Sequence, residues 1–117
     1  MTAEPFADII GLAAAILLPA TVLLALRRRV RLHEWTGYAI VALSVAHTMA
    51  SMYTPAIHHS SRLGLRFAMA ALLVVVVQLF VGVALKSSHA LRRTHFRLML
   101  VTFAVVVPHV VLNWRNG

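Results

Sequence analysis

The chain has 117 residues, of which 61% are apolar and 12% are charged, whereas an average soluble domain is about 45 to 50% apolar and about 25% charged. This composition excludes an ordinary water-soluble globule and predicts a protein that lies in a lipid bilayer. The formal charge of +8 comes from residues between apolar segments rather than along a basic surface or tail, so we expect no nucleic-acid partner.

Four charge-free stretches have about the length that a helix needs to cross a bilayer. They are 18, 19, 19 and 17 residues long and cover 9–26, 35–53, 67–85 and 98–114. Backbone groups in hydrocarbon must be bonded within their own segment, and short connections make consecutive helices antiparallel. We therefore predict an all-α fold, an integral membrane four-helix up-down bundle. It forms a single transmembrane domain over 1–117, with helices at about 9–26, 33–54, 66–86 and 95–114.

The basic residues predict the orientation of these helices. Eight of the eleven Lys and Arg residues follow the first and third stretches, and three lie on the opposite side. Short cytoplasmic loops carry an excess of Lys and Arg, so both termini are predicted to lie outside. The chain starts without basic residues, and its first stretch therefore predicts a permanent helix rather than a cleaved signal peptide. The eight are Arg27, Arg28, Arg29, Arg31, Lys86, Arg92, Arg93 and Arg97, and the three are Arg62, Arg66 and Arg115.

The two halves of the chain follow one plan. Each half has an apolar stretch, then a basic loop, then an Arg-x-His sequence that opens the next stretch, Arg31-Leu32-His33 in one half and Arg93-Thr94-His95 in the other. This plan predicts a parallel internal repeat about an axis along the membrane normal.

Four of the seven histidines form two pairs of equal spacing, His33 with His47 and His95 with His109. Fourteen residues make four turns of a supercoiled helix, so both members of a pair share one face, about 21 Å apart. The second and fourth helices run parallel, which places His33 level with His95 and His47 level with His109. Ionisable residues inside a membrane are candidates for function. The other three histidines are predicted to be solvated loop residues: His58, His59 and His89.

Two imidazoles from facing helices provide the axial donors of a planar iron macrocycle, which predicts b-type haem. The absence of cysteine excludes thiolate metal sites and haem attached through thioethers, so a cofactor must be held non-covalently. Small residues on the second helix leave room for porphyrin. We therefore predict two non-covalent, bis-histidine haem b groups, with iron ligands His33, His95, His47 and His109 and with Gly37 and Ser44 beside them.

Three segments of the chain resemble membrane b-type cytochromes: Leu32-His33-Glu34-Trp35-Thr36-Gly37-Tyr38, Ala46-His47 and His109-Val110-Val111-Leu112-Asn113-Trp114. The arrangement of the histidines is similar to that of the ferric-reductase-like transmembrane superfamily and of the haem-binding core of quinol-cytochrome c reductase cytochrome b. The overall plan resembles small bacterial four-helix di-haem cytochromes, which include electron carriers, anchor subunits and a superoxide-oxidising type.

The resemblance implies an inner haem on His33 and His95, an outer haem on His47 and His109, and a multi-pass protein of the bacterial inner membrane. The chain departs from the larger families. It lacks the helices that form quinone pockets in the large cytochrome b and the flavin and nicotinamide domains of ferric reductases. The resemblance therefore transfers no enzyme activity, and a quinone-linked or superoxide-oxidising activity stays open.

Transmembrane electron transfer is the function that these patterns favour, with exchange of electrons between quinone and either a small oxidant or reductant or a partner protein. One alternative is a transporter in which the four paired histidines relay protons or a soft metal ion. Another is a non-redox structural subunit of a larger membrane complex. The direction of electron flow and the oligomeric state have no signal in the sequence.

Overall fold

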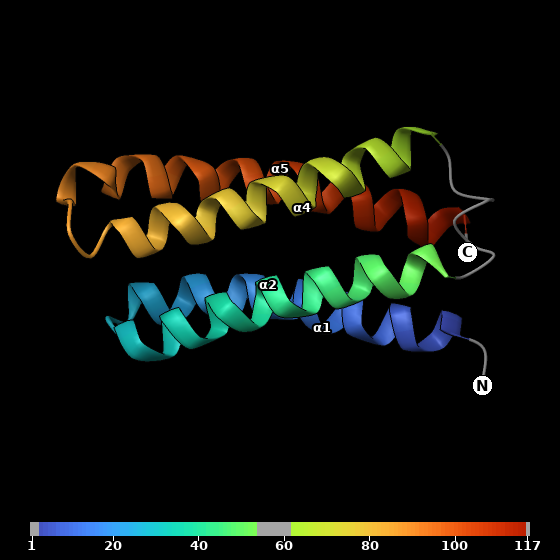
Figure 1. The fold of residues 1–117 in the computed structure, drawn as a ribbon, viewed down its shortest axis with the longest axis horizontal. Helices are drawn as coiled ribbons and strands as arrows, with labels where there is room; N and C mark the ends of the chain where they lie inside the picture. The colour runs from blue at the N-terminus through green and yellow to red at the C-terminus, as the bar shows by residue number, and fades with distance from the viewer. Residues whose placement is uncertain (1–2, 54–61, 117) are drawn as a thin grey trace. The chain divides into compact units, whose positions relative to one another are not determined.

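The computed structural model describes the backbone of residues 3–53 and 62–116 and the side chains of residues 5–53 and 62–113. Within these ranges the chain is helical and has no strand, which confirms the predicted all-α class (Figure 1). The elements are α1 (Ala3–Leu26), α2 (Val30–Met52), α4 (Arg62–Ala84), the short 3-10 helix η1 (His89–Leu91) and α5 (Arg92–Asn116).

The helices are longer than the charge-free stretches that predict them, or are displaced from them. α1 begins at Ala3 rather than at residue 9, α2 begins at Val30 rather than at 33, and α5 runs from Arg92 to Asn116 rather than over 95–114. α4 covers Arg62–Ala84 instead of 66–86. A helix continues through charged residues as long as its backbone bonds propagate, so an apolar run marks membrane-compatible length rather than helix ends.

Three helical segments in the described part of the chain are long and apolar enough to cross a membrane. They are Pro5–Leu26 in α1, Arg62–Ala84 in α4, and His89–Asn113 in η1 and α5. α2 has similar length but is less apolar, because polar side chains interrupt it at Thr36, Ser44, His47, Thr48 and Ser51. The predicted span over 35–53, which lies in α2 up to Met52, is therefore not among the three.

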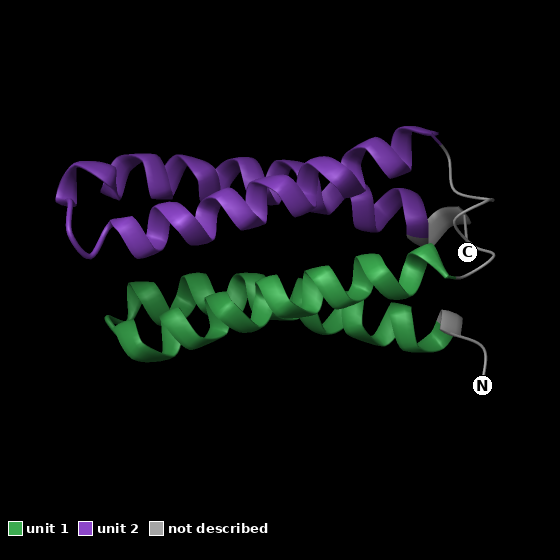
Figure 2. Ribbon diagram, in the orientation of Figure 1, with its two compact units in different colours: residues 1–58 green, residues 59–117 purple. Residues whose placement is uncertain are grey.

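The helices form two compact units, unit 1 over Met1–His58 and unit 2 over His59–Gly117 (Figure 2). In unit 1 α1 packs against α2, and in unit 2 α4 packs against α5. Both pairs are antiparallel, as the cross-helix contacts described below show. The unit boundary falls between the two halves of the predicted internal repeat, so each unit is a hairpin whose second helix begins close to an Arg-x-His sequence.

The α1–α2 hairpin packs along a seam with seven-residue spacing. Ala7, Ala14 and Ile40 are buried on this seam. Seven residues complete two turns of a supercoiled helix, so residues with this spacing stay in one line of contact. Antiparallel register then gives three layers, in which Ala7 is level with His47, Ala14 with Ile40, and Thr21 with His33. The two histidines of α2 therefore lie at the ends of the seam.

The turn between α1 and α2 is a Schellman motif. The Arg29 N–H donates to the Leu24 carbonyl over 2.9 Å, and the Arg28 N–H donates to the Ala25 carbonyl over 3.0 Å. Arg28 has a φ of 57°, the left-handed conformation that glycine usually provides at this position. An L-residue in this conformation costs about 1 to 2 kcal/mol. The motif ends α1 sharply and fixes the register of the hairpin.

Unit 2 has a polar middle layer where unit 1 has an apolar one. Thr102 is 1% exposed and donates a hydrogen bond to Oε1 of Gln78 over 2.6 Å. Thr102 lies seven residues from both His95 and His109, just as Ile40 lies midway between the histidines of α2. The two hairpins therefore share a seven-residue plan and differ in the chemistry of its centre.

Candidate functional site

Both histidines of α2 are hydrogen-bonded to the backbone of α1. His33 Nδ1 lies 2.9 Å from the carbonyl oxygen of Thr21, and His47 Nδ1 lies 2.8 Å from the carbonyl oxygen of Ala7. A carbonyl oxygen can only accept, so Nδ1 carries the proton in each neutral ring and the lone pair is at Nε2. Both rings are half-buried. The fold thus selects the same tautomer at the two ends of the seam.

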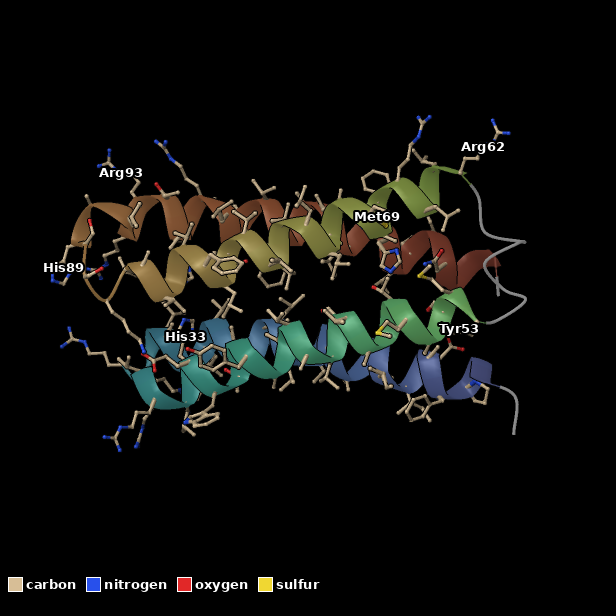
Figure 3. All side chains as sticks on the ribbon, in the orientation of Figure 1. His33, Tyr53, Arg62, Met69, His89 and Arg93 are labelled. Atoms are coloured by element: carbon tan, nitrogen blue, oxygen red, sulfur yellow. The ribbon has the colours of Figure 1, made fainter. Side chains whose placement is uncertain are left out.

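This tautomer is the one that a metal-binding histidine needs when Nε2 is the donor. Metal-binding histidines usually donate their other ring N–H to a carbonyl or a carboxylate, which fixes the ring and makes it more basic. His33 and His47 have this arrangement fourteen residues apart, which is about 21 Å along a helix. Figure 3 shows His33 at the turn end of α2 and Tyr53 at its far end.

Hydroxyl groups hold the first turns of α2 against α1 beside His33. The Thr21 hydroxyl hydrogen-bonds to the Thr36 hydroxyl. Thr36 Oγ1 also lies 2.9 Å from the carbonyl oxygen of His33 and 2.8 Å from that of Leu32. These contacts restrain the backbone that carries the His33 ring, so the ring is positioned from both its nitrogen and its main chain.

Two glycines allow a histidine ring to lie close to the backbone of the neighbouring helix. A Cβ placed on Gly11 would lie 2.7 Å from Cε1 and Nδ1 of His47. A Cβ on Gly82 would lie 3.1 Å from Cε1 of His95. Neither glycine is among the residues predicted to form the site. A glycine inside a helix costs about 1 kcal/mol relative to alanine, so an interior glycine signals a place where another group can approach the helix backbone closely, but the sequence does not say which group.

His109 has a side-chain partner on its own helix. Its Nδ1 lies 3.1 Å from the amide nitrogen of Asn113. The amide nitrogen can only donate, so in this arrangement a neutral His109 ring carries its proton on Nε2. Rotation of the amide group by 180° would place its oxygen at Nδ1 and select the Nδ1–H tautomer instead. The tautomer of His109 therefore depends on a side chain that mutation can change, unlike the backbone partners of the α2 histidines.

The two small residues predicted beside the ligands lie on the helical face that carries His33 and Ile40. A Cβ on Gly37 would meet no described atom within 4 Å, so there is open space beside α2 at this position. Ser44 is half-buried, and its carbonyl accepts a hydrogen bond from Thr48 over 2.8 Å.

The structure places the predicted ligands within their own units: His33 and His47 contact α1, and the ring of His95 lies over α4. The pairing of ligands from different units stays a prediction. His89 is exposed in η1, whereas His58 and His59 lie outside the described residues. Among the side chains that the structure describes, no group of three or more His, Cys, Asp or Glu residues gathers to hold a metal ion.

No family model matches the chain, and neither a curated protein nor a solved structure matches it. The chemistry of the donor set is therefore the guide to the ligand class. The imidazoles of His33 and His47, with the proton fixed on Nδ1, fit the axial positions of haem iron.

Proposed function

We propose that the chain is a transmembrane electron-transfer cytochrome that holds two haem b groups non-covalently through bis-histidine ligation. The observation that carries this proposal is the pair of hydrogen bonds from Nδ1 of His33 and of His47 to backbone carbonyls of α1. These bonds give both rings the tautomer with a lone pair at Nε2. When bound, haem b supplies one-electron redox chemistry.

Each haem takes one ligand from α2 and one from α5 in this proposal. His33 and His95 bind the inner haem, and His47 and His109 bind the outer haem. The equal fourteen-residue spacing on the two helices supports this assignment, since it makes the ligands of α2 and α5 equivalent in the internal repeat. The assignment requires the two hairpins to associate as an up-down four-helix bundle.

We further propose that all four helices span the bacterial inner membrane with both termini outside. Large apolar side chains point away from the seams, among them Ile16 at 60% exposed, Leu73 at 65% and Phe80 at 69%. Contiguous exposed apolar surface of this kind suits lipid. In unit 2, Arg62 lies at one end, and His89 and Arg93 lie at the other (Figure 3). The charges thus lie where a bilayer would have its two aqueous surfaces.

Membrane quinone is the electron-exchange partner that suits ligands carried within apolar helices, because quinone is itself dissolved in the bilayer. The second partner is a small oxidant or reductant or a redox protein. The basic turn at Arg27, Arg28 and Arg29 favours an anionic reactant or an acidic protein surface, with a strong dependence of the rate on salt concentration.

A pyridine haemochrome spectrum of the purified chain tests the proposal. We expect two haem b groups for each chain, and acidified organic solvent should extract the colour completely because no covalent link holds it. Reduced-minus-oxidised absorption bands should appear in membranes from an overproducing cell. If the chain binds no haem, either as purified or after incubation with hemin, the proposal of a cytochrome is wrong. That result would favour a transporter or a structural subunit.

A further inference from the structure

We propose that Gly11 is a positioning residue for His47. It allows the imidazole to reach the Ala7 carbonyl and so fixes Nε2 as the iron-binding nitrogen. The role of Gly11 at the outer haem rests on the proposed function, whereas its effect on the ring of His47 does not.

The geometry of α1 explains why a glycine is needed at this position. Cα–Cβ bonds of a helix tilt toward its N-terminus, so a side chain covers the turn that precedes it. A side chain at residue 11 would therefore extend toward the Ala7 carbonyl, where its Cβ would meet the His47 ring. Without a Cβ at Gly11, the His47 ring approaches until Nδ1 is 2.8 Å from that carbonyl oxygen.

An alanine at residue 11 would displace the ring. Its Cβ would lie 2.7 Å from both Cε1 and Nδ1 of His47, whereas carbon atoms in good contact lie about 3.5 to 4.0 Å apart. The displacement moves the atom that donates the hydrogen bond, so the bond to Ala7 lengthens or breaks. The ring then loses its fixed tautomer and the direction in which Nε2 presents its lone pair.

The close approach is specific to one ligand of each proposed haem. Ala25 stands fourteen residues after Gly11, at the equivalent place beside His33, and the His33 ring reaches the Thr21 carbonyl with that alanine present. The need for glycine at residue 11 therefore comes from the placement of the His47 ring over α1 and not from the hydrogen bond as such. In unit 2 the ring that lies over a glycine is that of His95, on Gly82. The glycines therefore serve different haems, Gly11 the outer and Gly82 the inner.

The first test uses haem-free protein in detergent micelles with ¹⁵N-labelled histidine. The ¹⁵N chemical shifts of Nδ1 and Nε2 report which nitrogen of each imidazole carries the proton. The resonances of His47 are assigned as those that disappear from the spectrum of His47→Ala. We expect the Nδ1–H form in the parent protein and a mixture of tautomers in Gly11→Ala. An unchanged tautomer in Gly11→Ala would overturn the inference.

The second test uses protein loaded with haem and reads the two low-spin centres separately by electron paramagnetic resonance. Gly11→Ala should shift the outer signal and weaken outer haem binding about 10- to 100-fold, the usual effect of losing the partner of a ligating histidine. Gly82→Ala should act on the inner signal only, and Ala25→Gly should change neither. Equal effects of Gly11→Ala on both centres, or no effect, would contradict the proposal.

A double variant separates positioning from folding. If Gly11→Ala lowers the yield of folded protein, Gly11→Ala with His47→Ala should restore it, because removal of the ring removes the collision. A double variant that folds no better than Gly11→Ala would show that alanine at this position disrupts α1 itself, against the proposal. If the parent protein binds no haem, the proposed function fails while the nitrogen shifts still decide the role of Gly11.

Discussion

Thr102 donates a hydrogen bond to Gln78 across the α4–α5 hairpin over 2.6 Å, and Thr102 is only 1% exposed. Thr102→Val removes the hydroxyl and leaves the Gln78 amide without this partner. We expect a loss of about 0.6 to 1.7 kcal/mol in unfolding free energy, the range for hydrogen bonds between membrane helices. Adding Gln78→Leu should restore most of the loss, because the polar group is then gone as well. Chemical denaturation in detergent measures both, and a double variant less stable than Thr102→Val would contradict this reading.

The pairing of ligands predicts which single substitutions are equivalent. His47→Ala and His109→Ala should each leave about one haem for each chain, since the inner pair is about 21 Å away along the helix and keeps both ligands. The double variant should resemble either single variant, because members of one site are not additive. The haem-to-protein ratio measures this outcome. His89→Ala serves as the control and should retain both haems. Loss of both haems from a normally folded double variant would show that the pairing is wrong.

Asn113 gives a means of tuning the outer haem. In Asn113→Asp the carboxylate can only accept, so it holds the proton on Nδ1 of His109 and makes the ring a more basic ligand. A more basic ligand favours ferric iron, so the midpoint potential of the outer haem should fall by about 59 mV for each tenfold gain in that preference. A redox titration followed spectroscopically measures it. A raised outer potential, or a shift confined to the inner haem, would refute the role of Asn113.

The strained turn of unit 1 predicts a stabilising substitution. Arg28 has a φ of 57°, and glycine adopts this conformation without steric cost. Arg28→Gly should therefore raise the unfolding free energy by about 1 kcal/mol. Arg27→Gly removes the same charge at a neighbouring position without a positive φ, and it should not stabilise the protein. Thermal unfolding of the three proteins in one detergent makes the comparison.

The orientation of the chain is testable with reporters fused at either end. Eight Lys and Arg residues on one side against three on the other place both termini outside. A reporter that works only in the cytoplasm should stay inactive at both termini, and one that works only outside should be active at both. Cytoplasmic activity at both ends would mean that the topology is inverted.

The length of the charge-free stretches was enough to predict the helices, and the fourteen-residue spacing was enough to predict the shared face of His33 and His47, because both properties depend on residues close in sequence. It was not enough to predict which helix those rings contact. The hydrogen bonds to Ala7 and Thr21 depend on the register between α1 and α2, and this register is set by a turn whose left-handed residue is an arginine rather than the usual glycine.

The helix ends and the close contacts of the histidine rings also could not be predicted from the sequence. Charge-free runs end where lipid compatibility ends, whereas α1 continues to Ala3 because its backbone bonds do not depend on side-chain polarity. Gly11 and Gly82 lie inside the apolar stretches 9–26 and 67–85. Their importance depends on a histidine distant in sequence that lies over each of them, and no local pattern contains that information.

The register of unit 1 links the two ends of its seam. The contacts of Ala7 with His47 and of Thr21 with His33 are fourteen residues apart on both helices, so one alignment of α1 and α2 satisfies both. Insertion of one residue into α2 between His33 and His47 would rotate one ring by about 100° relative to the other, so no single alignment with α1 would keep both hydrogen bonds. The hydrogen bonds that position His33 and His47 therefore form together when α1 and α2 pack, even though about 21 Å of helix separates the two rings.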